Sequence, residues 1–289
     1  MAVRRLASVL VFLSGFFLVS GVTAGPLVFS GVTTAGAGDA AFNAVINSYR
    51  AALGGGLNPP GACAPACTGG RREINWDAVP VAASSPNAFP GDFFNGTSGV
   101  QPAGRQRGAT FTTPGTGFRV SATEFSDETG FGPAEFDPFS PARLFASMGS
   151  NITDATFSVP GSPLSAARTR GFGVVFSDVD YTGSASLEFF TRAGNSLGLF
   201  AVPGVFPVAD GRNSQGSFSF LGIVFNNPLV SRVRIVSGSH GIDGNYVGND
   251  DAVVMDDFIY GEPTTVPEPA ALGLLVAGFG VLALRRRRQ

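Results

Sequence analysis

The stretch Gly171-Phe172-Gly173-Val174-Val175-Phe176-Ser177-Asp178 decides the fold class. Phe and Val favour strands, and a short apolar run of this length is typical of a buried strand. Eight further short runs rich in such residues are separated by Gly, Pro, Asn or Ser; they are 109–112, 118–122, 155–159, 185–191, 197–202, 218–225, 230–237 and 252–260. Because no helical patterns alternate with these runs, they predict a mainly β, antiparallel, jelly-roll-like β-sandwich.

One helix is predicted before these runs. Residues 27–30 form a short expected strand, after which Asp39 can cap a helix that stops at the glycines 54–56. Its apolar positions fall on one face at helical spacing; they are Phe42, Val45, Ile46, Tyr49 and Leu53. We therefore expect the helix to lie against a sheet.

Residues 57–107 are rich in Pro, Gly, Ala and Asn, which predicts a long irregular segment packed on the sandwich and interrupted by Glu73-Ile74-Asn75-Trp76-Asp77. Trp76 is the only tryptophan. A hydrophobic plug over the edge of the sandwich is the favoured interpretation, and a platform on which a ligand stacks is the alternative.

Composition excludes several classes of protein. The 289 residues are 44% hydrophobic and 14% charged, which argues against bulk disorder and a coiled coil. All 19 basic residues are arginines, and six of them lie at the two ends. Without the end segments, 13 arginines face 20 acidic residues, a formal charge of −7. Such an acidic body argues against nucleic acid as a partner.

The N-terminal end has the pattern of a cleavable signal peptide. Arg4 and Arg5 precede an apolar run over residues 6–19, and Val22-Thr23-Ala24 supplies the small residues that a signal peptidase reads. A core helix or a membrane anchor is the alternative, but the run is short for a spanning helix. We expect residues 1–24 to be a signal peptide and the protein to be exported.

The C-terminal end has three parts. Val266, Pro267, Glu268 and Pro269 are followed by fifteen uncharged, mostly apolar residues and then by Arg285, Arg286, Arg287 and Arg288. As a helix, the apolar part would be about 22 Å long, marginal for a bilayer. The arginines can snorkel to the headgroups and hold this end on the cytoplasmic side. The pattern predicts a hydrophobic helix that contacts the membrane, with the body outside the cytoplasm.

This tail resembles the PEP-CTERM sorting signal of exported bacterial proteins, with residues 266–269 as the short motif. The resemblance implies recognition and cleavage near the motif by an exosortase, and a bacterium that makes exopolysaccharide. A plain single-span anchor is the alternative. The expected organisation is a signal peptide (1–24), the helix and irregular segment (25–107), the sandwich (108–262) and the sorting tail (263–289).

A second resemblance covers most of the body. The stretches 70–77, 170–180 and 254–261 are similar to those of a group of uncharacterised exported bacterial proteins. This resemblance implies that the helix and the Trp76 segment belong to one unit with the sandwich, and it implies no activity.

The two cysteines, Cys63 and Cys67, are close in sequence, and an exported chain can keep a disulfide. A local disulfide is the favoured interpretation, and unpaired thiols are the alternative. Two thiols alone do not make a metal site.

The acidic residues suggest the most specific chemistry. Asp178 and Asp180 share a face if their segment is extended, and Asp256 and Asp257 lie in an apolar terminal strand just after Asp250 and Asp251. Buried carboxylates need partners, and Ca²⁺ is a hard cation that takes oxygen ligands. A structural calcium site formed by Asp178, Asp180, Asp256 and Asp257 is therefore one hypothesis. The arrangement of these acids also resembles that in jelly-roll carbohydrate-binding modules, in which an Asp of the last strand often joins a structural calcium site.

The alternative for these acids is simpler. Asp256 and Asp257 would bond to backbone amides or arginine, and the other acids would be solvated residues of turns.

Enzymatic motifs are not evident. His240 is the only histidine and lies in a loop-like stretch, and the sequence has no G-x-S-x-G, P-loop or zinc motif. The expectation is a non-enzymatic binding or structural component of the envelope or extracellular matrix, associated with exopolysaccharide. The alternatives are a glycan hydrolase using Glu188 or Asp180, and an adhesive surface protein.

Overall fold

The computed structural model describes residues 25–61, 67, 69–97, 101–133, 135–209, 212–242, 246 and 250–265. The expected signal peptide and the sorting tail from residue 266 onward lie outside these residues.

The elements follow one another in this order: β1 (Leu27–Thr33), α1 (Ala40–Ala52), β2 (Arg71–Ile74), two 3₁₀ turns (Val81–Ala83 and Ala103–Arg105), β3 (Ala109–Thr112), β4 (Gly117–Ser121), β5 (Leu144–Met148), β6 (Ile152–Val159), β7 (Ser162–Arg168), β8 (Gly171–Ser177), β9 (Ser186–Phe190), β10 (Ser196–Ala201), β11 (Phe218–Val224), β12 (Arg232–Val236), β13 (Val254–Gly261) and β14 (Thr264–Thr265).

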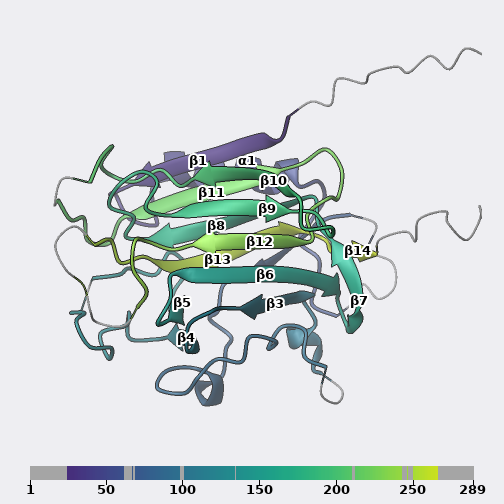
Figure 1. Cartoon of the computed structure of the whole chain (residues 1–289), viewed down its shortest axis with the longest axis horizontal. Coiled ribbons are helices and arrows are strands. Elements are labelled where there is room, and N and C mark those ends of the chain that lie inside the picture. The colour runs from purple at the N-terminus through teal and green to yellow at the C-terminus, as the bar shows by residue number, and fades with distance from the viewer. Residues whose placement is uncertain are drawn as a thin grey trace, which may run out of the picture.

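The strands form two antiparallel sheets of seven (Figure 1). The first has the order β1-β11-β8-β13-β5-β4, with β2 also paired to β13, and the second has the order β10-β9-β12-β6-β7-β14, with β3 also paired to β6. The prediction of a mainly β, sandwich-like fold with one helix is confirmed. Each of the nine predicted apolar runs overlaps a strand.

Four strands were not predicted: β2, β5, β7 and β14. Two of them, β2 and β14, are only four and two residues long. Strand β7 contains Pro163 and exposes Leu164, so it has neither a regular alternation nor a strong strand propensity. Such short or weakly patterned strands form because a neighbouring strand offers backbone hydrogen bonds.

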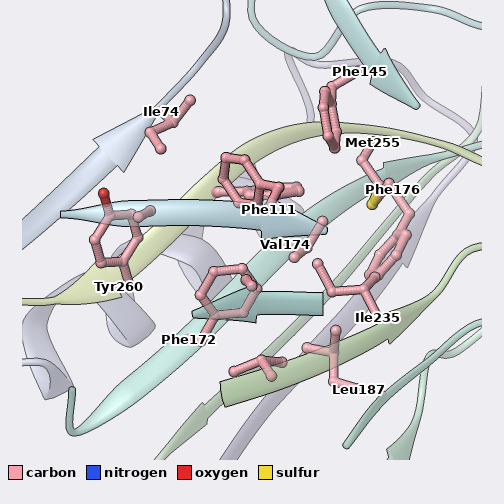
Figure 2. Packing of buried hydrophobic residues seen from close by; sticks show 14 of the residues in the cluster. Ile74, Phe111, Phe145, Phe172, Val174, Phe176, Leu187, Ile235, Met255 and Tyr260 are labelled. Carbon is pink, nitrogen blue, oxygen red and sulfur yellow. The ribbon is translucent and has the colours of Figure 1, made fainter. Parts of the chain in front are cut away.

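The main core lies between the sheets and is unusually aromatic (Figure 2). Phe145 and Phe172 of the first sheet are 0% exposed, and Leu187 and Ile235 face them from the second sheet, to which Phe111, 2% exposed, also belongs. Alternating buried and half-buried residues along β6, β9 and β12 follow from one face of the second sheet packing on this core.

Trp76 belongs to this core. It is 1% exposed, its ring stacks on that of Phe145 with centroids 4.1 Å apart, and its Nε1 donates to the carbonyl of Asp256 over 2.6 Å. The interpretation as a hydrophobic plug is confirmed, and a ligand-stacking platform is wrong because only 1% of the residue is exposed and its ring is packed against Phe145.

Helix α1 packs on the outer face of the first sheet, against β1 and β11 (Figure 1). Asp39 caps it by accepting a hydrogen bond from the Ala41 N–H over 2.8 Å, as predicted. Tyr49 is fully buried and lies over Gly173 and Gly222, where an added Cβ would come within 2.9 Å and 2.6 Å of its ring. Glycine at these two positions lets the helix approach the sheet closely.

Candidate functional site

The first candidate site is a cluster of buried carboxylates, Asp178, Asp180 and Asp251, which we call the carboxylate cluster. Their residues are 2%, 3% and 0% exposed. Asp178 and Asp180 follow β8, and Asp251 lies just before β13, the neighbour of β8 in the first sheet. Pairing of β8 with β13 therefore brings together acids that are 71 residues apart in sequence.

Serine and backbone groups connect the cluster. The Ser214 hydroxyl lies 3.4 Å from Asp178 Oδ1 and 3.0 Å from Asp180 Oδ1, and the Ser214 N–H also donates to Asp180. Asp251 Oδ2 accepts from the Asp180 N–H over 3.2 Å. A single hydroxyl is thus shared by two carboxylates.

The predicted geometry of Asp178 and Asp180 is only half right. Strand β8 ends at Ser177, and Asp178 has a left-handed φ of 70°, so the segment is not extended and the alternation of faces does not apply. The two carboxylates nevertheless meet, because both contact Ser214. Ser214 lies in the connection between β10 and β11, and no pattern in the sequence indicated it.

Burial raises the pKa values in the cluster. Burial raises the pKa of Asp178 to about 9; the charges of Asp180, Asp251 and Glu135 add to the rise, and the Ser214 hydroxyl opposes it. Burial also raises the pKa of Asp180, against the hydrogen bonds from Ser214. The pKa of Asp251 is raised to about 7, mainly by burial. Ionised carboxylates are therefore costly here.

The second predicted acidic pair, Asp256 and Asp257, lies farther along β13 and has different partners. Asp256 Oδ2 accepts from the Phe139 N–H over 2.7 Å and the Ser140 N–H over 3.0 Å, and the Ser140 hydroxyl lies 3.0 Å from Asp256 Oδ1 and 2.8 Å from Asp257 Oδ1. Arg50 Nη2 is 3.7 Å from Asp257. Burial and the neighbouring carboxyl group hold the pKa of Asp256 well above its usual range.

The structure thus divides the four acids of the calcium hypothesis into two groups, and no described contact joins Asp178 or Asp180 to Asp256 or Asp257. For Asp256 and Asp257 the observed partners are those of the simpler alternative, namely backbone amides, a serine and an arginine. Among the described residues, no group of three or more His, Cys, Asp or Glu side chains stands at the spacing of a metal centre.

The residues considered for catalysis do not come together. Glu188 lies in β9 and accepts a hydrogen bond from the Ser196 hydroxyl over 2.8 Å, whereas Asp180 belongs to the carboxylate cluster. The His240 ring packs edge-on against Tyr246, and its Nδ1 lies 3.1 Å from the carbonyl of Gly241. No described contact links His240 to Glu188 or Asp180.

A second candidate site consists of three neighbouring cavities, which we call the arginine cavities. Their volumes are about 280, 250 and 320 Å³. Arg105 lines the first and third, and Arg107 lines the first and second. The guanidinium carbon of Arg105 lies 4.0 Å from the ring centre of Phe93. No pattern in the sequence indicated this site, because residues 57–107 have no periodic pattern.

Several predicted residues cannot be placed. Val266, Pro267, Glu268 and Pro269, the arginines 285–288, and Cys63 all lie outside the described residues. Cys67 is disulfide-bonded, and its pairing with Cys63 stays a prediction. Within the described residues, no helix has the length and apolar character needed to cross a membrane.

Comparison with known proteins adds no relative: no family model matches the chain, and no curated protein matches it.

Proposed function

We propose that this protein is an exported, exosortase-sorted component of the envelope or extracellular matrix of a bacterium, where it binds or supports exopolysaccharide without catalysing a reaction. The observation that carries this proposal is the tail: Val266-Pro267-Glu268-Pro269, an apolar stretch and four arginines, in that order. The signal-like N-terminus and the acidic, lysine-free body support the same destination.

The position of the last described strand is compatible with processing at the motif. The last described strand, β14, ends at Thr265 and pairs with β7, and the motif begins at the next residue. Cleavage in the motif would therefore remove none of the described strands.

The order of the strands supports the finer description of the body as jelly-roll-like. From β7 to β13, the chain changes sheet at every connection except the β9–β10 hairpin. Such crossing between two antiparallel sheets is typical of jelly rolls, which often serve as binding modules.

The arginine cavities are the surface that best suits a sugar polymer. Arg105 and Arg107 offer hydrogen-bond donors and positive charge, while Asn75, Gln101 and Gln106 offer amides. Phe93 supplies an apolar wall beside Arg105. This combination of a planar cation, amides and an aromatic ring suits the hydroxyls and carboxylates of an acidic polysaccharide.

Sorting is tested in a bacterium that has an exosortase and in the same strain without it. We expect the full chain to appear as a shorter, extracellular form only when the exosortase is present, and the combined change Pro267→Ala and Glu268→Ala to abolish the shortening. Pro207→Ala, at an exposed loop position, is the matched control. Equal processing in both strains would refute sorting by this route.

Binding is tested by affinity electrophoresis of the full chain in gels that contain exopolysaccharide from the producing cells, with dextran as the neutral comparison. Retardation by the exopolysaccharide should fall at least severalfold in Arg105→Ala and should be unchanged in Arg192→Ala, which removes an exposed arginine from a hairpin turn. Release of reducing ends during incubation would instead favour a hydrolase, and an absence of retardation would favour a structural or adhesive role.

A further inference from the structure

The carboxylate cluster has too few hydrogen-bond donors for its charges. Asp178 and Asp180 share the Ser214 hydroxyl, which can donate only one hydrogen bond and also lies 3.0 Å from the Ser217 hydroxyl. None of the ion pairs between described residues includes Asp178, Asp180 or Asp251. Buried carboxylates in this state are strongly destabilising unless something neutralises them.

A single oxygen atom gives independent evidence that something else binds here. Oδ1 of Asp251 is shielded from solvent and accepts no hydrogen bond, and the residue is 0% exposed. The nearby Ser184 hydroxyl donates instead to the carbonyl of Tyr181 over 2.9 Å. A fully buried carboxylate oxygen without a protein hydrogen-bond donor is rare in native proteins.

Asp256 and Asp257 provide an internal comparison within the same strand. They are as deeply buried as the cluster, but Asp256 receives two peptide N–H groups on Oδ2, and both acids contact the Ser140 hydroxyl. Burial alone therefore does not distinguish the carboxylate cluster from Asp256 and Asp257. The shortage of hydrogen-bond donors to its carboxylates does.

We propose that the carboxylate cluster binds a divalent cation, Ca²⁺, with Asp178 and Asp180 as its acidic ligands and Asp251 as the third negative charge beside them. The side-chain atoms that could ligate a cation here are all oxygens, from the carboxylates and from the hydroxyls of Ser214 and Ser217, which matches a hard cation and not a soft metal. The site requires neither Asp256 nor Asp257. It is also independent of polysaccharide binding, since none of its residues lines the arginine cavities.

Isothermal titration of the full chain with CaCl₂ at pH 7 tests the proposal. We expect one site with a dissociation constant of about 1 mM or tighter, and a melting temperature several degrees higher in saturating Ca²⁺ than in chelator. Mg²⁺ in a parallel titration should bind more weakly.

Variants locate the site. Asp178→Asn and Asp251→Asn should each weaken Ca²⁺ binding at least tenfold, while Asp154→Asn, which removes an equal charge from a half-buried ion pair with Arg232 and Arg234, should not. Both cluster variants should fold, because an amide removes a buried charge. Wild-type protein that binds no Ca²⁺ at about 10 mM, or unchanged affinity in both cluster variants, would overturn the proposal whatever the stability of the variants.

Discussion

Arg72 and Glu262 form a fully buried, two-pronged ion pair that joins the irregular segment to the end of β13. Arg72 Nε lies 2.7 Å from Glu262 Oε2, Nη2 lies 3.0 Å from Oε1, and the side chains are 1% and 3% exposed. The remaining nitrogen, Nη1, donates to the carbonyl of Gln106 over 3.1 Å. One arginine therefore fixes β2, the chain before β3 and the last long strand relative to one another.

Breaking this pair should be costly. Arg72→Ala leaves a buried carboxylate without its partner, so we expect the free energy of unfolding to fall by about 3–5 kcal/mol. Urea denaturation of the full chain measures this loss. The double change Arg72→Met and Glu262→Leu should recover much of it, because no buried charge is left alone.

The control for this prediction is the half-exposed pair of Arg119 and Glu128, whose side chains are 31% and 18% exposed. Arg119→Ala should cost less than about 1 kcal/mol. Equal losses at Arg72 and Arg119 would mean that burial does not set the strength of the Arg72 pair.

Trp76 should act purely as a core residue. Trp76→Ala removes the ring that stacks on Phe145 and should lower the free energy of unfolding by about 3–5 kcal/mol. In the wild type, the emission of this single tryptophan should be blue-shifted and resistant to acrylamide. A red-shifted emission that acrylamide quenches readily in the folded wild type would contradict a purely structural role for the ring.

Close approach of helix α1 should depend on glycine. Gly222→Ala places a Cβ within 2.6 Å of Tyr49, so we expect a loss of about 1–3 kcal/mol from overpacking, measured by urea denaturation. Gly132→Ala meets no atom within 4 Å and serves as the control, with a change of less than about 0.5 kcal/mol. If Tyr49→Ala is combined with Gly222→Ala, the two losses should not add fully, because the closest clash disappears with the Tyr49 ring and only the contact of 2.9 Å with Phe220 is left.

Stability in chelator should fall as pH rises. The pKa of an aspartate in the unfolded chain is about 3.9. In the folded protein the pKa is about 7 for Asp251 and about 9 for Asp178. Between these values the folded state holds protons that the unfolded state has released. The contribution of Asp251 is complete below about pH 4 and is lost as pH rises through 7; that of Asp178 is lost as pH rises through 9.

Melting temperatures between pH 5 and pH 8, measured in chelator, check this prediction. Asp251→Asn should flatten the decline, because the amide does not titrate. An equally steep decline in the variant would show that other groups cause it.

Local patterns were sufficient for most of the fold. The helix cap at Asp39 and the apolar face with Ile46 and Tyr49 depend on neighbours within a few residues, so the pattern predicted α1 correctly. The long apolar runs predicted their strands for the same reason. Strand β7, with its Pro163 and exposed Leu164, has no such local signal and exists because β6 and β14 pair with it.

The sites depended on distant contacts. The sequence pointed to Asp178 and Asp180 as a pair but assigned Asp256 and Asp257 as their partners, because acids in one strand look alike when their neighbours are unknown. The register of β13 against β8 decides which acids meet. Val254 pairs with Ser177, which places Asp251 near Asp180 and leaves Asp256 beside Ser140.

The sequence by itself determined the class of the fold and the helix, because strand propensity, capping and apolar periodicity are properties of consecutive residues. Only the tertiary structure decided that Trp76 is buried, that Arg72 meets Glu262, and which carboxylates lack donors. These outcomes depend on which strands pair and in what register. The free energy of a buried charge depends on its partners, and these partners lie far away in the sequence.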